Sequence, residues 1–253
     1  MELLELSWPA VKALNRDTPV VLPIAALEQH GKHMPVFTDS LLLGEVLRRV
    51  KLAVGDRVLF APLYWLGNSE HHLDFPGTMS ASPRAYLDSL RDMAENFLHH
   101  GFRRIVFVNG HGGNIVPAQQ ATFELRQKYR ARNDLLLLSL TYWTAGAEPT
   151  REIDGLHQDR MGHACEWETS MILRLAPQLV VGDVAAVPDV PFGRAFEPGH
   201  RAWTMPDRSV PGHIGFPRYA TADKGERLFQ SFARAVSAFL ERVVAWDGRE
   251  WDV

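Results

Sequence analysis

The stretch RIVFVNGHGGN, residues 104–114, decides the fold. Its run IVFV is continuously apolar, as in a strand that is buried on both faces of a sheet. Glycines follow Asn109; they let the backbone turn sharply and leave His111 at the edge of the sheet. The amphipathic segment NIVPAQQATFELRQKYRA, residues 114–131, comes next. A buried strand, a turn and a helix in this order predict one unit of a parallel α/β fold.

The same alternation extends in both directions along the chain. Further buried strands are expected at PVVLPIA (19–25), RVLFAPLYW (57–65) and DLLLLSLTYW (134–143). Helices are expected at residues 39–53, 83–101 and 226–246, the second beginning with proline and ending at glycine. This pattern predicts a single α/β domain over residues 1–253, a three-layer α/β/α fold with a mainly parallel central sheet. In such sheets the ligand site lies beyond the carboxyl ends of the strands.

Composition narrows the class of protein. The chain has 253 residues, of which 46% are hydrophobic, enough for a sizeable core. A formal net charge of −3, with no stripe of Lys and Arg, argues against a nucleic-acid partner. No basic start precedes an apolar run and no run is long enough to cross a membrane, so we expect a cytoplasmic protein without a membrane partner.

The cysteine count limits the kind of metal site. Cys165 is the single cysteine of the sequence, so neither an intramolecular disulfide nor a thiolate-rich zinc site can form. Any metal must therefore be held by histidine and carboxylate.

The region of residues 185–217 has no clear period. It contains VPDVPFGRAFEPGH and VPGHIGFP, whose prolines and glycines predict long loops. A stretch of this length without regular structure in a compact domain is usually functional or forms an interface.

One segment concentrates metal-ligand chemistry. Residues 28–39 read EQHGKHMPVFTD and bring Glu28, His30 and Asp39 together just after the first strand. Such a cluster can be a solvated surface loop, but imidazole and carboxylate are also the ligands of zinc, manganese and iron. His111 follows the third strand, at the same edge of a parallel sheet. The GHGGN segment around it lacks the lysine and the glycine spacing of a phosphate-binding loop.

A second acidic cluster is HACEWETS, residues 163–170. If these residues are helical, His163 and Glu166 lie three apart and face one pocket. The alternative is that the glutamates only complement the dipole at the start of a helix.

Five segments in this order resemble the creatininase (creatinine amidohydrolase) family. They lie between residues 22 and 229 and read LPIAALEQHGKHMPVFTD, GNSEHHLDFPGTMS, VNGHGGN, HACEWETS and GHIGFPRYATADKGERLF. The resemblance implies the α/β/α fold already expected from the alternation. It also implies a binuclear metal centre at the strand ends, with two divalent ions per chain. Zinc is the expected metal, and manganese and iron are the alternatives.

The resemblance also assigns the ligands. It implies that Glu28, Asp39 and His111 bind one ion, and that His30, the bridging Asp39 and a further carboxylate bind the other. Creatininase takes that carboxylate from a GHYEN segment, where this chain has Gly113. We therefore expect the glutamate of HACEWETS at position 166, Glu166, to be the replacement ligand. Glu168 is then expected to support the ligands or to pair with the start of the helix.

The implied activity is hydrolysis of a non-peptide C–N bond by metal-activated water. His163 matches the catalytic histidine of the family and would pass a proton to the departing nitrogen. The substrate would be a small amide, either a cyclic amide such as creatinine or a formamide. Trp143 matches a tryptophan of the substrate pocket, whereas Asp159 stands where a second one is expected.

Two other functions stay open at this stage. One is a metal-dependent peptidase of redox-cofactor maturation, because relatives with GHGGN include such an enzyme. The other is a non-catalytic metal-binding or assembly protein. The resemblance further implies a closed homo-oligomer, commonly a hexamer, with the loop of residues 67–80 and the stretch of residues 185–217 as candidate contacts.

Overall fold

The central element is a four-stranded parallel sheet with the order β2-β1-β3-β4. The computed structural model describes residues 1–193 and 196–248. Its strands are β1 (Val20–Ile24), β2 (Leu59–Phe60), β3 (Arg104–Asn109) and β4 (Leu136–Thr141). All three strand pairs are parallel, which confirms the predicted type of sheet.

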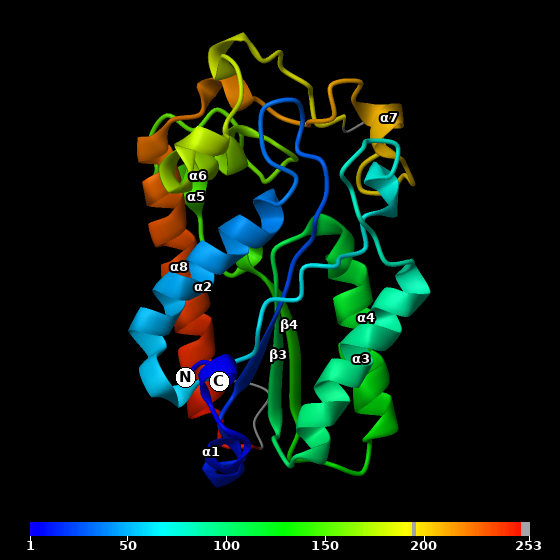
Figure 1. Ribbon diagram of the computed structural model, residues 1–253, viewed down its shortest axis with the longest axis vertical. Helices are drawn as coiled ribbons and strands as arrows, with labels where there is room; N and C mark the ends of the chain where they lie inside the picture. Colours follow the sequence, from blue (N-terminus) through cyan, green and yellow to red (C-terminus); the bar gives the residue numbers. More distant parts are fainter. Residues whose placement is uncertain (194–195, 249–253) are drawn as a thin grey trace.

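Two helical layers cover the two faces of the sheet (Figure 1). One layer holds α2 (Thr38–Val54), α6 (Glu166–Leu175) and α8 (Ala222–Ala245). The other holds α3 (Pro83–His99) and α4 (Ile115–Lys128). Shorter helices are α1 (Trp8–Ala13), α5 (Pro149–Glu152) and α7 (Met205–Arg208). The three-layer α/β/α fold expected from the alternation is confirmed.

Single turns of 3-10 helix occupy many of the connections. They are η1 (Leu3–Glu5), η2 (Gly55–Arg57), η3 (Glu70–His72), η4 (Gly112–Asn114), η5 (Tyr142–Thr144), η6 (Pro177–Leu179), η7 (Val184–Ala186) and η8 (Pro217–Tyr219).

The strands alternate between two hydrophobic cores. Val20, Leu22 and Ile24 of β1 pack with α3 and α4, whereas Val21 packs with α2, α6 and α8. All four side chains are buried, because a strand sends successive residues to opposite faces. On the second face, α8 approaches α6 so closely that a Cβ at Gly225 would lie 2.0 Å from the carbonyl oxygen of Ser170. Glycine is therefore required at this helix crossing.

One sequence-based boundary differs from the structure. The second strand was expected over residues 57–65, but β2 ends at Phe60 and only an isolated bridge between Tyr64 and Ile24 follows. Pro62 has no N–H for a ladder and interrupts the strand. Residues 185–217 are mostly irregular, as predicted, apart from short turns, α7 and a bridge between Val190 and Gly215; residues 194–195 lie outside the described part.

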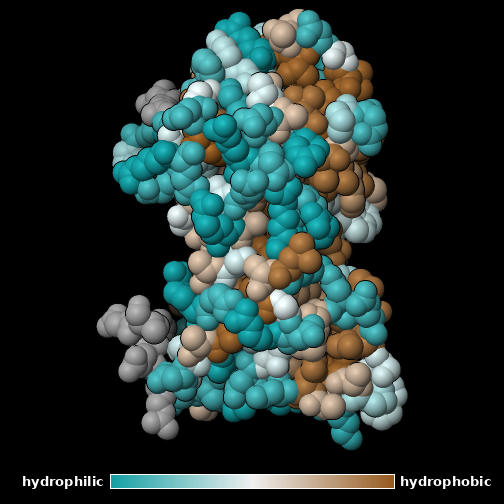
Figure 2. All heavy atoms as spheres, turned by 90° about the vertical axis from the view of Figure 1, so that its left-hand side faces the viewer, coloured by the Kyte–Doolittle hydropathy of each residue, from teal (hydrophilic) through white to brown (hydrophobic). Residues whose placement is uncertain are grey.

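Polar residues dominate the outer surface of the α2 and α8 layer. Figure 2 shows this face, with a hydrophilic centre and hydrophobic residues gathered along its right-hand edge. Within residues 1–193 and 196–248, no helix is both long and apolar enough to cross a membrane. The loops after the strand ends gather at the upper end of the molecule in Figure 1, where a site of the parallel α/β type is expected.

Candidate metal centre

Four of the predicted ligands meet beyond the carboxyl ends of β1 and β3. The two carboxylate oxygens of Asp39 face different histidines: Oδ1 lies 3.2 Å from His30 Nε2, and Oδ2 lies 3.0 Å from His111 Nδ1. Glu28 Oε1 lies 3.3 Å from the same nitrogen of His111. Each of these residues is at most 4% exposed. The prediction that the first-strand loop, the start of α2 and the third-strand turn converge is therefore confirmed.

Three more histidines surround the cluster. His163 Nδ1 lies 3.6 Å from Glu28 Oε1, and His72 Nε2 lies 3.4 Å from the same oxygen. A ligand atom of His71 lies within 4.8 Å of ligand atoms of Glu28 and His111. His71 and His72 belong to the GNSEHHLDFPGTMS segment, and sequence reasoning did not assign them to the site. The adjacent histidine pair was the available signal.

Backbone carbonyls fix the tautomers of three histidines, because a carbonyl oxygen can only accept a hydrogen bond, so the ring nitrogen that faces it must carry the proton. His30 Nδ1 donates to the carbonyl of Glu28 at 3.1 Å, and His111 Nε2 donates to that of Asn68 at 3.1 Å. His163 Nε2 donates to the carbonyl of Gln29 at 2.8 Å. In the neutral form each ring therefore turns an unprotonated nitrogen toward the cluster. This is the arrangement of metal-ligating histidines, whose second nitrogen is held by an outer partner.

Gln29 connects two of the histidines. Its side-chain amide donates to the carbonyl of Gly212 and to His72 Nδ1, both at 2.8 Å, and its oxygen accepts from Gly31 N at 2.8 Å. Both protons of the amide nitrogen are then used. This nitrogen also lies 3.1 Å from His163 Nε2, but it has no proton left to donate, so the two atoms form no hydrogen bond. Because His72 Nδ1 accepts the hydrogen bond from Gln29, neutral His72 carries its proton on Nε2. That nitrogen faces Glu28. His72 thus supports Glu28 as a hydrogen-bond donor.

The protonation states of the cluster follow from burial and charge. Burial lowers the pKa of His111, but the charges of Glu28 and Asp39 outweigh it and raise the pKa to about 10. Burial favours the neutral acid of Asp39, yet the charge of His30 brings its pKa well below the usual range. Burial lowers the pKa of His163 well below its ordinary value and that of His72 to about 2. Without a metal, His111 is a cation at neutral pH, while His163 and His72 are neutral.

The donor set fits divalent metal ions. Glu28 Oε2, His30 Nε2 and Asp39 Oδ2 are buried and form no hydrogen bond, although potential partners lie close by. Side chains that bind one ion point at the ion and are not aligned for hydrogen bonds with one another. Two atoms, each about 2.1 Å from a tetrahedral zinc, lie about 3.4 Å apart. The His30, Asp39, Glu28 and His111 contacts of 3.0–3.3 Å are close to that spacing.

The structure corrects the assignment of Glu166. Its carboxylate faces away from the cluster, where Oε1 pairs with Lys224 Nζ at 2.7 Å and Oε2 accepts from the backbone N–H of His157 at 2.8 Å. Glu168 takes the expected place: its Oε1 lies 3.8 Å from His30 Nε2, and it belongs to a potential ligand group with His30 and His163. The expectation that Glu168 points away from the pocket is wrong.

The error came from the position of the helix start. His163 and Glu166 would share one helical face only if the helix included both, but α6 begins at Glu166. His163 instead pairs with Ile214 through two backbone hydrogen bonds of 2.9 and 2.7 Å, and Ala164 after it has a φ of +48°. The helical phase therefore does not reach His163. The expected pairing of Glu168 with the helix start is confirmed, because its Oε2 accepts from Cys165 N at 3.4 Å.

The GHGGN turn leaves no room for the glutamate of a GHYEN segment. A Cβ at Gly113 would lie 2.2 Å from the carbonyl oxygen of Asn68 and 2.5 Å from His111 Nε2. The same carbonyl holds the tautomer of His111. A larger residue at position 113 would therefore push away the group that orients this histidine.

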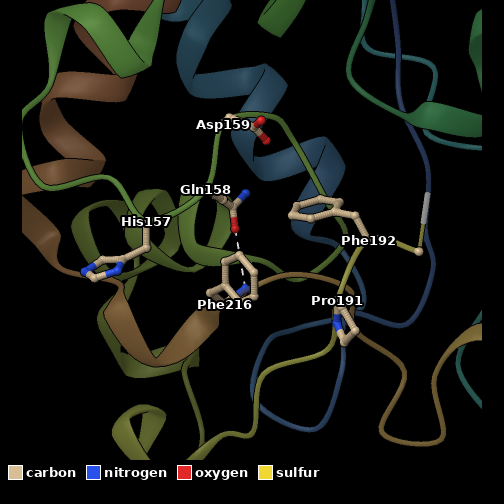
Figure 3. Close-up of a pocket in the computed structure, with 7 residues that line it drawn as sticks. His157, Gln158, Asp159, Pro191, Phe192 and Phe216 are labelled. Atoms are coloured by element: carbon tan, nitrogen blue, oxygen red, sulfur yellow. Dashed lines mark hydrogen bonds between the residues drawn. The ribbon is translucent and has the colours of Figure 1, made fainter. Parts of the chain in front are cut away.

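Two cavities adjoin the segment that leads to His163. One has a volume of about 530 Å³ and is lined by Trp143, Trp167, Asp159 and Arg160 among others. The other has a volume of about 480 Å³ and is lined by residues 157–159, residues 191–193 and Phe216 (Figure 3). Trp143, the predicted substrate-binding residue, lies in η5, directly after β4. Its side chain lines the first of these cavities. Both cavities are of a size that takes small organic ligands.

Together, the parallel α/β/α fold and a buried histidine and carboxylate cluster at the strand ends are typical of metal-dependent hydrolases. The family model of creatininase, described as creatinine amidohydrolase, matches residues 4–240. The chain therefore belongs to the creatininase family, and its resemblance to this family is confirmed.

Individual relatives cover nearly the whole chain. A creatinine amidohydrolase of Pseudomonas putida is 30% identical over 249 residues, which span 92% of this chain and 93% of that protein. A mycofactocin precursor peptide peptidase of Mycolicibacterium smegmatis is 31% identical over 240 residues, 93% of this chain and 88% of the relative.

Solved creatininases have the same fold. A mutant creatininase complexed with creatine superposes with a TM-score of 0.80 at 27% identity, covering 96% of this chain and 98% of the other. A structure named "Creatininase Mn" has a TM-score of 0.78 at 28% identity, covering 95% and 97% of the two chains. The expectation of a creatininase-family hydrolase is confirmed at this level.

Proposed function

We propose that the chain is a binuclear amidohydrolase that cleaves a C–N bond other than a peptide bond in a small amide. The observation that carries the proposal is the position of Asp39, whose Oδ1 faces His30 and whose Oδ2 faces His111. A carboxylate placed in this way can bridge two ions, as in two-metal hydrolytic sites. Membership of the creatininase family supports the reaction class.

Each ion would have three protein ligands. Glu28, Asp39 and His111 would hold the first, and His30, Asp39 and Glu168 the second. Three protein ligands leave a position for water or substrate, which is the mark of a catalytic rather than a structural site. Histidine and carboxylate accept zinc, manganese or iron, and we propose zinc as the resident metal with manganese as the main alternative.

The ions, when bound, would lower the pKa of a water molecule and polarise the carbonyl of the amide. His163 is neutral at pH 7 and turns Nδ1 toward Glu28, so this nitrogen can accept the proton of the attacking water. The C–N bond then breaks, and the same proton passes from Nδ1 to the departing nitrogen. The products are a carboxylic acid and an amine. Backbone pairing with Ile214 and the carbonyl of Gln29 keep the ring in place.

The cavity beside Trp143 is proposed to take the part of the substrate that does not react. Its indole forms one wall, and Asp159 and Arg160 add charged groups. A wall of this kind suits a planar, polar amide. Arg151 of α5 also lines this cavity and pairs with Glu148.

A peptidase is the second candidate, and the size of the cavities favours it. Asp159 lines both cavities, of about 530 and 480 Å³, so they adjoin along one segment. A single creatinine-sized ring would fill only a small part of this space. An extended peptide could occupy both, and the relative from Mycolicibacterium smegmatis is a peptide peptidase.

A substrate screen separates these functions. The metal-loaded chain is incubated with creatinine, other cyclic amides, formamidopyrimidines and short peptides, and the new amine is quantified. We expect turnover of a cyclic amide or formamide that stops after chelation and in Asp39→Asn. Turnover of peptides alone would favour the peptidase. Full metal content without any turnover would support a non-catalytic metal-binding protein.

The assembly and location stay predictions. We propose a closed homo-oligomer, a hexamer, that works in the cytoplasm with each chain acting as one catalytic domain. Leu73 and Met79 of the loop 67–80 are 53% and 51% exposed, which supports a contact role for this loop. A mass near 28.5 kDa in light scattering would contradict the oligomer.

A further inference from the structure

Glu166 is a fully buried carboxylate outside the metal centre. Its Oε2 accepts hydrogen bonds from the backbone N–H groups of His157 at 2.8 Å and Gln158 at 3.1 Å. Its Oε1 pairs with Lys224 Nζ at 2.7 Å, and Lys224 also donates to the carbonyl of Tyr219 at 2.8 Å. Burying a carboxylate is costly unless it is paired and hydrogen-bonded, and here both conditions are met.

Gln158 also forms a hydrogen bond to the backbone of Glu166. Its side-chain oxygen accepts from Glu166 N at 3.1 Å and from Phe216 N at 3.4 Å, the bond drawn in Figure 3. Its side-chain nitrogen donates to the carbonyl of Arg160 at 2.8 Å. The side chain of Glu166 therefore binds the backbone of residues 157–158. In return, the side chain of Gln158 accepts the hydrogen bond of the first N–H of α6. The two residues form a reciprocal lock between α6 and residues 157–160.

The locked segment lies where the substrate would bind. Asp159 lines both cavities, and Figure 3 shows His157 pointing in a different direction, away from Phe192. The ring of His157 stacks on Tyr219 with centroids 3.6 Å apart, which fixes the other side of the segment. Three residues beyond Arg160 the chain reaches His163. The position of the cavity wall is thus coupled to that of the proposed proton carrier.

We propose that Glu166 is a positioning residue that holds residues 157–160 as the wall of the substrate site, with Lys224 as its counter-charge. This rests on the proposed function only in taking the cavities as the substrate site. Glu166 acts through the backbone of His157 and Gln158 and touches neither metal nor substrate. The lock ties the substrate wall to α6, the helix that also carries Glu168 to the metal centre.

The test compares Glu166→Gln with a matched control. Arg174 of α6 forms an ion pair with Glu226 of α8 at 2.8 Å, so Arg174→Gln also removes a charged contact between these helices, but at the surface. Hydrogen–deuterium exchange of the peptide spanning residues 155–162 is measured in both variants. We expect exchange at least about tenfold faster in Glu166→Gln, because the neutral amide has one acceptor oxygen where the carboxylate uses two, so the two backbone N–H groups and Lys224 Nζ lose their charged acceptor. Arg174→Gln should exchange like the unchanged chain.

Metal content and kinetics complete the test. Glu166→Gln should keep the metal content of the unchanged chain, and its KM should rise more than its kcat falls. Gln158→Ala removes the other half of the lock and should give the same changes, which keeps the test decisive if Glu166→Gln does not fold. Exchange no faster than in Arg174→Gln, or loss of metal, would overturn the proposal. Fast exchange with an unchanged KM would overturn the link to substrate.

The exchange measurement does not depend on the substrate. If no amide or peptide is turned over by the unchanged chain, the proposed function fails, whereas protection of residues 155–162 still supports or refutes the lock. Failure of the two proposals is therefore distinguishable.

Discussion

Replacing Glu168 with glutamine should empty one metal position. Glu168 is the third ligand proposed for the second ion, and its Oε1 lies 3.8 Å from His30 Nε2. Glutamine keeps the shape and still offers an oxygen to Cys165 N, which Glu168 Oε2 contacts at 3.4 Å. The change therefore removes the negative charge and leaves the helix start capped. Only His30 and the shared Asp39 would then hold the ion.

The size of the effect follows from ligand loss. Disturbing even an outer partner of a ligand costs about 10- to 100-fold in metal affinity, so loss of a direct carboxylate should cost at least about 100-fold. A 100-fold weaker affinity removes about 2.7 kcal/mol of the stabilisation that saturating metal provides. In a domain of this size that corresponds to a Tm lower by about 5–10 °C in the presence of metal. In chelator, the Tm should match that of the unchanged chain.

Elemental analysis and thermal unfolding check this prediction. Glu168→Gln should carry about one ion per chain, while Glu166→Gln, two positions earlier in the same helix, should carry about two. Two tightly held ions in Glu168→Gln would refute the ligand assignment. A lower Tm in chelator would show that the substitution damages the fold instead.

Four further outcomes are expected. Asp39→Asn should lose both ions, since Asp39 faces both sites; elemental analysis that finds them retained would contradict bridging. Metal binding should release protons from His111, whose pKa is about 10 in the metal-free protein, and from His30, whose pKa the charge of Asp39 also raises against the effect of burial, so affinity should rise as the pH increases toward 10. Calorimetry in buffers of different ionisation enthalpy measures this release. Because the raised pKa of His111 also favours folding, its contribution to metal-free stability is full below about pH 6.5 and fades as pH rises toward 10. Trp143→Ala should raise KM without changing metal content, and an unchanged KM would remove Trp143 from the substrate site.

Local patterns were enough to predict the layers of the fold. The apolar run of β3 and its turn gave a strand with the expected neighbours, because both signals depend on nearby residues alone. The convergence of Glu28, His30, Asp39 and His111 followed from the rule that parallel strands end at one edge. The limits of β2 were missed because Pro62 breaks a ladder inside an apolar run.

Long-range geometry could not be predicted in the same way. The choice between Glu166 and Glu168 depends on where α6 begins, and that is set by the pairing of His163 with Ile214, 51 residues away. The approach of His72 to Glu28 depends likewise on the path of a loop without a period. Neither contact leaves a repeating pattern in the sequence.

The most direct test of a two-metal hydrolase is a titration of activity with metal. The metal-stripped chain receives zinc, or manganese in a parallel series, and the initial rate of C–N cleavage is measured on the best substrate of the screen. We predict a rate that keeps rising until about two ions are bound per chain and then stays constant. A rate that is already maximal at one ion per chain, or no cleavage with both sites filled, would contradict the account.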